Sequence, residues 1–297
     1  MKKKGGLAIN KPWEAYVFLA PWILGLLGFT IIPMAMSLYF SFTHYDMANP
    51  PIWIGLDNFK TMFADKRMIK SLQVTTTYVF AGLPFQLAFA LLLAVILKRN
   101  HKGVRIYRAI YYLPSLLGGS VAVALLWRNI FGKEGVVNQI LAVFGIVGKS
   151  WIATPSTALS MLVLLQIWQF GGSMVIFLGG LKNISTDYYE AASIDGAGKI
   201  TSFFRITVPL LTPMVFFNVV MGIIGSFQAF TSSFIISGGN GSPLDTTLFY
   251  TLYLYIKAFR QFNMGYASAM AWLLLVIIAI FTKLCFMFAD KWVYYDE

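Results

Sequence analysis

The segment YYEAASIDGAGKITSFFRITVPLLTP, residues 188–213, is the most polar stretch in the second half of a strongly apolar chain. It lies between two long hydrophobic segments. Its charged residues are Glu190, Asp195, Lys199 and Arg205. We interpret it as a short structured element that faces water, and its role depends on the sequence around it.

A short helix is predicted at the start of this segment, over about residues 188–195. Asp187 lies three residues before Glu190, which is the spacing of a capping box. Gly196 and Gly198 then predict the end of the helix, because glycine readily adopts the left-handed conformation that stops one. On local evidence alone, a docking surface for a partner and an amphipathic connector on the membrane are equally good interpretations.

The composition places most of the chain in lipid. Of its 297 residues, 58% are hydrophobic and only 12% are charged, and the mean hydropathy is +0.70. Soluble domains carry about 25% charged residues. The net charge of +11 is typical of basic loops on the cytoplasmic side of a membrane protein. Because these basic residues are scattered through short loops, nucleic-acid binding is excluded.

Six apolar segments are long enough to cross a bilayer, which takes about 20 residues each. They cover residues 15–42, 72–97, 106–130, 157–181, 208–236 and 266–288. The sequence therefore predicts an all-α polytopic membrane protein with a single domain over residues 1–297. A second short helix is predicted over 200–206, within the loop 182–207 that precedes the fifth span. The segment 248–259, LFYTLYLYIKAF, is interpreted as a helix on the outer membrane surface.

Charge sets the predicted orientation. An even number of spans puts both termini on one side, and 14 of the 23 Lys and Arg residues fall on that side. Basic residues collect in cytoplasmic loops. Both termini and the loop 182–207 are therefore predicted to be cytoplasmic.

Residues with catalytic or metal-binding chemistry are sparse. The two histidines, His44 and His101, fall on opposite sides of the membrane, and no cluster has the spacing of metal ligands. This argues against a membrane-embedded enzyme, and we expect no metal site. No carboxylate lies in the middle of a span, which argues against an ion-coupled carrier. If the chain moves a solute, the energy is expected to come from elsewhere.

The polar segment resembles the EAA motif of binding-protein-dependent ABC importer permeases. That motif reads Glu-Ala-Ala, three residues, Gly, nine residues, Ile, one residue, Leu-Pro. The matching residues here are Glu190, Ala191, Ala192, Gly196, Ile206 and Pro209, with Val208 in place of the usual Leu. Asp195-Gly196-Ala197 is similar to a common extension of the motif in carbohydrate permeases. The segment 20–43 resembles the first span of the branch that serves maltose, lactose and glycerol-phosphate importers.

The resemblance implies a type I ABC importer permease in a bacterial plasma (inner) membrane. Its coupling residues would be Tyr188, Tyr189, Glu190, Ala191, Ala192, Asp195, Gly196, Ala197, Ile206 and Pro209. They would seat a coupling helix in two cytoplasmic ATP-binding subunits, which bind the ATP and Mg. The chain itself would hold no cofactor and no catalytic site. A second homologous permease would complete a heterodimer, and an extracytoplasmic binding protein would deliver a sugar or oligosaccharide. A phosphorylated polyol or another small solute is the alternative cargo.

Polar residues within the spans are the candidates for sugar contacts, because such groups are costly in lipid unless they face a cavity or another helix. They are Gln166, Trp168, Gln169, Asn218, Ser226 and Gln228. Asn218 and Gln228 recur near helical spacing and are expected to share a face. Interhelical hydrogen bonding is the alternative role for each of them.

Overall fold

The computed structural model describes residues 12–98 and 103–294, and it divides into two compact units. The first contains Met1–Met62 and Lys257–Trp272, and the second contains Phe63–Ile256 and Leu273–Glu297. Within these described residues, five helical runs are long and apolar enough to cross a membrane, or six if a sharply bent pair is counted as one span. The prediction of a helical, multi-pass membrane protein is confirmed.

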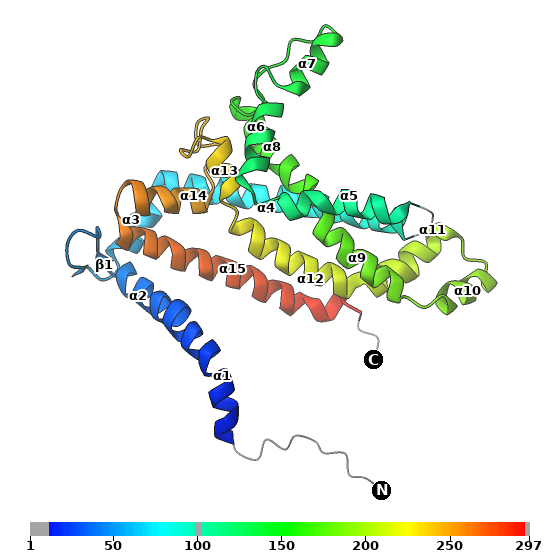
Figure 1. Ribbon diagram of the computed structural model, residues 1–297, viewed down its shortest axis with the longest axis horizontal. Coiled ribbons are helices and arrows are strands. Elements are labelled where there is room, and N and C mark those ends of the chain that lie inside the picture. Colours follow the sequence, from blue (N-terminus) through cyan, green and yellow to red (C-terminus); the bar gives the residue numbers. More distant parts are fainter. Residues whose placement is uncertain (1–11, 99–102, 295–297) are drawn as a thin grey trace. The chain divides into compact units, whose positions relative to one another are not determined.

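The first unit begins with a long apolar helical run. It consists of α1 (Pro12–Leu26), the π-helical turn η1 (Leu27–Ile31) and α2 (Ile32–Ser41) (Figure 1). Pro33 follows the π-helical turn directly, and because proline has no N–H it removes one backbone donor from the run. Over Tyr16–Ser41 the most apolar window has no buried residue, as expected for a helix whose surroundings are lipid or another chain.

A small hairpin follows this run. Strand β1 (Thr43–His44) pairs antiparallel with β2 (Ile52–Trp53), and α3 (Asp57–Ala64) comes next. The buried Asn58 donates to the carbonyls of Ser41 and Thr43, which fixes the start of α3 against the hairpin. At Gly265 a Cβ atom would lie 2.0 Å from the Thr43 carbonyl oxygen, so only glycine permits this backbone approach.

The second unit is built around α4 (Lys66–Leu97), the longest helix in the described residues. Its N-terminus is capped by Asp65, which accepts from the backbone N–H groups of Arg67 and Met68. Around it pack α8 (Pro155–Trp168), α9 (Gly171–Asn183), α12 (Val208–Phe227) and α14 (Tyr250–Tyr255). The second half of α15 (Met264–Trp292) meets α12 where Phe216 packs edge-on against Phe286, 5.0 Å between ring centroids.

The third predicted span is wrong as one continuous helix. Residues 106–130 fall in α5 (Val104–Leu117) and α6 (Val121–Ile130), and the two axes differ by 102°. Gly118 and Gly119 separate them, and the Ser120 hydroxyl caps the new helix by accepting from the Val123 N–H. In Figure 1, α5 runs beside α9, whereas α6 leads away to α7 (Val136–Val143). Two adjacent glycines and a capping serine supply the local signals for this break.

Two further expectations differ from the structure. The helix predicted over 200–206 does not stop before the fifth span: α11 (Lys199–Ser202), the π-turn η2 (Phe203–Thr207) and α12 form one helical run. Pro209 follows the π-turn within this run, and because proline has no N–H it removes one backbone donor there. The segment 248–259 is not a surface helix at its start, because Leu248, Phe249 and Tyr250 are fully buried. The Tyr250 N–H donates to the Thr75 hydroxyl on α4.

Candidate functional site

The polar segment of the second unit forms a short separate helix, α10 (Asp187–Ile194). Thr186 occupies the N-cap position without a side-chain hydrogen bond. The capping role predicted for Asp187 is therefore wrong, since this residue already lies within the helix. Its N–H donates to the Ser185 hydroxyl, 3.3 Å. Asp187 and Glu190 both lie in the first turn, where their negative charges interact favourably with the positive end of the helix dipole.

The C-terminal end of α10 is closed by a Schellman motif, as the glycines predicted. The Ala197 N–H donates to the Ala192 carbonyl at 2.8 Å, and the Gly196 N–H donates to the Ser193 carbonyl at 3.1 Å. Gly196 adopts φ +78°, the left-handed conformation that this motif needs. Gly198 has an ordinary extended conformation, φ −71° and ψ 167°, and serves as the N-cap of α11. Of the two glycines, only Gly196 is required by the backbone.

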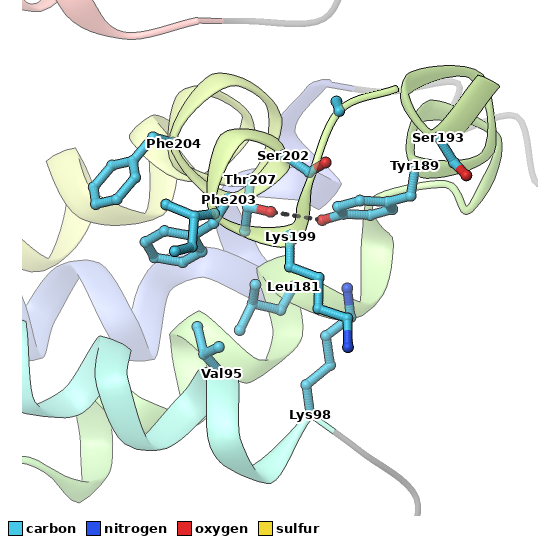
Figure 2. Close-up of a pocket in the computed structure, with 12 residues that line it drawn as sticks. Val95, Lys98, Leu181, Tyr189, Ser193, Lys199, Ser202, Phe203, Phe204 and Thr207 are labelled. Atoms are coloured by element: carbon cyan, nitrogen blue, oxygen red, sulfur yellow. Dashed lines mark hydrogen bonds between the residues drawn. The ribbon is translucent and has the colours of Figure 1, made fainter. Parts of the chain in front are cut away.

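Tyr189 ties α10 to the start of the next span. Its hydroxyl is 2.9 Å from the Thr207 hydroxyl, at the end of η2 (Figure 2). Thr207 lies between Ile206 and Pro209, two of the predicted coupling residues, and most of the others belong to α10. The hydrogen bond therefore joins the two helical segments that contain these residues. The Lys98 ammonium group, at the end of α4, lies 4.9 Å from the centroid of the Tyr189 ring.

The opposite side of α10 is open. Glu190 and Ala191 are exposed, and Ile194 is 87% exposed. A large apolar side chain that is exposed beside a carboxylate and an alanine suits a protein surface that a partner covers. Sequence reasoning named Glu190 and Ala191 but missed Ile194. The signal was available, since residues four apart lie on one helix face.

Beneath α10 lies a largely apolar cavity of about 670 Å³ (Figure 2). Its floor comes from the ends of α4 and α9, through Val95 and Leu181, and from Phe203 on η2. Lys98 and Lys199 are the basic residues in its lining. Helix α10 therefore does not pack tightly on the neighbouring helices over its whole length.

A second cavity, of about 420 Å³, lies within the second unit and has a polar lining. Four of the six candidate sugar contacts line it: Gln166, Gln169, Ser226 and Gln228. The Gln166 amide donates to the Ser226 hydroxyl at 2.8 Å and so joins α8 to α12. Its Oε1 atom is buried without a hydrogen-bond partner.

The structure separates the other two candidates from this cavity. The Asn218 amide donates to the Met214 carbonyl one turn earlier in its own helix, 2.8 Å. The half-buried Trp168 packs against Trp127, with ring centroids 5.7 Å apart. Gln228 lines the cavity, whereas the buried Asn218 does not, so only one of these two residues reaches the space where a sugar could bind.

Gln86 lines the polar cavity and was missed by sequence reasoning. Its amide donates to the Gln169 carbonyl at 3.2 Å, and the Gln169 amide donates to the Gly118 carbonyl at 2.9 Å. Gln86 follows Pro84 in the most apolar part of α4. A polar side chain within an apolar span is the signal that could have identified it. Gly82 lies directly against the Gln166 amide, so a Cβ atom at this position would force the Gln166 side chain to move.

Among the residues that the structure describes, no three His, Cys, Asp or Glu side chains are close enough to hold a metal ion. Amides, hydroxyls and glycines line this cavity together with the apolar side chains of Leu165, Ala229 and Phe230, and its described lining holds no charged side chain. Such groups can bond hydroxyl-rich solutes but offer no ion pair.

Residues 70–293 match the family described as "Binding-protein-dependent transport system inner membrane component". The chain belongs to this family. It is 56% identical to the probable ABC transporter permease protein YesP of Bacillus subtilis, over 95% of this chain and 92% of that protein. It is 31% identical to the arabinooligosaccharides transport system permease protein AraP of the same organism, over 92% and 88% of the two chains.

The fold also matches a solved structure, that of a bacterial ABC transporter involved in the import of the acidic polysaccharide alginate. The TM-score is 0.83 at 22% identity, over 95% of this chain and 97% of that one. The permease resemblance stated from the sequence is confirmed, as are the permease fold and an inner-membrane location. The family implies a binding protein as partner.

Proposed function

We propose that this permease moves a sugar or oligosaccharide across the membrane, and that α10 is the helix through which separate ATP-binding subunits drive it. The observation that carries the coupling role is the bounded, open helix: a Schellman motif fixes one end, Tyr189 bridges to Thr207, and Glu190 with Ile194 remains exposed. A rigid helix with one free face can transmit the movement of a bound partner.

The proposed assembly has four kinds of component. Two ATP-binding subunits, with ATP and Mg, would engage α10 from the cytoplasm, where both termini of this chain would also lie. A second homologous permease would form a heterodimer with this one. The binding protein would deliver its solute on the opposite side. Nucleotide binding would shift the permease between inward-open and outward-open states, because the partner binds one state more tightly.

The polar cavity favours a neutral saccharide over a phosphorylated polyol. Amide and hydroxyl groups from Gln166, Gln169, Ser226 and Gln228 can exchange hydrogen bonds with sugar hydroxyls. A phosphate would be expected to meet Arg or Lys, and the described lining holds neither. Relatives that carry oligosaccharides, such as AraP, support the same choice.

Uptake by the complete transporter in proteoliposomes tests both the coupling role of α10 and the polar cavity as the sugar path. Glu190→Lys should abolish uptake while the protein still inserts, because the reversed charge faces the partner. Gln228→Ala should lower sugar uptake and sugar-stimulated ATPase activity, whereas Asn218→Ala serves as the matched control outside the cavity. Full transport by Glu190→Lys would reject the coupling role, and equal loss in both alanine variants would reject the cavity as the sugar path.

A further inference from the structure

The cavity beneath α10 has the lining of a lipid site. It combines an apolar floor with two ammonium groups, Lys98 and Lys199, and its described lining contains no acidic residue. We propose that this cavity binds an anionic phospholipid, with the phosphate between the two lysines and an acyl chain along the floor. The placement of this cavity at the cytoplasmic leaflet rests on the orientation given under Proposed function.

The two lysines lie on different helices and point into the same space. Lys98 ends α4 and Lys199 begins α11, and both side chains extend toward the part of the cavity beside Tyr189 (Figure 2). Within residues 12–98 and 103–294, neither forms a salt bridge. Two like charges that share a cavity repel each other, and an anion between them removes the repulsion.

The floor favours a lipid over a free anion. Val95 and Leu181 lie near the ends of two candidate spans, so the cavity opens where the hydrocarbon core gives way to water. Phe204 borders it and is 65% exposed, and Ile200 is 76% exposed. A free phosphate would use the lysines and leave this apolar surface uncovered. A phospholipid covers both, and basic pockets between membrane helices on the cytoplasmic side are known sites for anionic headgroups.

The size of the cavity is adequate for this occupant. About 670 Å³ is within the range of small-molecule pockets, and it holds a headgroup with the first part of one acyl chain. The remainder of the lipid would lie in the bilayer. An acidic segment of a partner protein would match the lysines but would bury its polar backbone against the apolar floor, which is unfavourable without hydrogen-bond partners.

Such a lipid would touch the coupling helix directly. Tyr189 and Ser193 of α10 line the cavity, as does Ala197 in its C-terminal cap. A bound lipid would therefore fill the space between α10 and the spans, and it would restrict the local motion of this helix. The lipid composition of the membrane would then set how firmly α10 is held before the ATP-binding subunits engage it.

Binding of defined lipids to the full-length chain in mild detergent, counted by native mass spectrometry, tests the proposal. The probes are phosphatidylglycerol, phosphatidylcholine and inorganic phosphate. We expect phosphatidylglycerol to bind at least tenfold more tightly than phosphatidylcholine. Lys98→Ala with Lys199→Ala should weaken it roughly 30-fold, from about fivefold for each basic residue at a membrane surface. The double arginine variant should keep the site.

Two controls separate charge from shape. Lys133→Ala with Lys149→Ala removes the same charge elsewhere in the second unit and should leave binding unchanged. Ser202→Trp fills the cavity while keeping both lysines, so it should weaken phosphatidylglycerol but not inorganic phosphate. Equal binding of the two lipids, no effect of the double alanine variant, or full competition by inorganic phosphate would each overturn the lipid proposal.

The coupling role is measured separately. Glu190→Lys should retain phosphatidylglycerol binding, since Glu190 does not line the cavity. If the double alanine variant instead lost association with the ATP-binding subunits while lipid binding was unchanged, the lysines would belong to the protein interface and the proposal would be wrong. Normal uptake with no lipid preference would reject the lipid site and leave the proposed function intact.

Discussion

Replacing Gly196 by Ala should destabilise the C-terminal end of α10. The free-energy cost depends only on the backbone conformation at this residue. Gly196 has φ +78°, and a Cβ atom built there would meet nothing within 4 Å. The penalty is therefore conformational and not steric. An L-residue in the left-handed region costs about 1–2 kcal/mol. That cost corresponds to a roughly 5- to 30-fold larger population in which the two Schellman hydrogen bonds are open.

Hydrogen exchange of the full-length protein in lipid nanodiscs measures this opening. The Ala197 amide, which donates to Ala192, should exchange about 5- to 30-fold faster in Gly196→Ala. Gly196→Asn should give a smaller change, because asparagine tolerates the left-handed region. A bulky residue at this position should also abolish uptake while insertion stays intact, because the open face of α10 would no longer be presented in one orientation.

Gly198→Ala is the matched control, two residues along the chain. Gly198 has φ −71°, and a Cβ atom there also meets open space. This variant should leave both exchange and uptake close to those of the original protein. Equal behaviour of Gly196→Ala and Gly198→Ala would refute the argument, because it would show that the left-handed turn is not what closes α10.

Further changes test other parts of the second unit. Gly82→Ala should destabilise the protein by about 1–3 kcal/mol and reduce uptake, because the new Cβ atom must displace the Gln166 amide. Thermal unfolding in detergent would measure the loss of stability. Asp245→Asn should lower stability by at most about 1 kcal/mol, because its bidentate pair with Arg67 is partly exposed; an unchanged midpoint in Arg67→Gln together with a large loss in Asp245→Asn would contradict this.

The end of α10 was predictable because its causes lie within a few residues. Gly196 stops the helix through hydrogen bonds that reach back three and five positions, so all of the participants lie within a few residues of each other in the sequence. The N-terminus of α10 was harder to predict, because two adjacent residues could each occupy the N-cap position. Asp187 and Thr186 are both residue types that favour the N-cap position, and the spacing to Glu190 selected Asp187, whereas the N-cap position is that of Thr186. A shift of one residue lies within the uncertainty of any helix boundary.

Averaging of hydropathy over a long window accounts for one error, and contacts between distant segments account for others. A window average of hydropathy over 106–130 passes across Gly118 and Gly119, so the segment resembled one span despite the 102° bend. Leu248 to Tyr250 resembled a surface helix because aromatic residues favour membrane interfaces. Their burial depends on Thr75, more than 170 residues earlier, which no local pattern reveals. Helical spacing grouped Asn218 with Gln228, but spacing along one helix does not show which residues reach the cavity. That depends on how the neighbouring helices pack.

One helix connects the two sites, and this explains how they could work together. Thr207, which bonds Tyr189 of α10, immediately precedes α12, and Ser226, which bonds Gln166 in the polar cavity, lies in the last turn of α12. Ser226 lies nineteen positions after Thr207, which corresponds to roughly 28 Å at 1.5 Å per residue of helix. If α10 moves with the ATP-binding subunits as proposed, the start of α12 must follow or the Tyr189 bond must break. A continuous helix carries that displacement to Ser226, where it changes the geometry of the cavity that would hold the sugar.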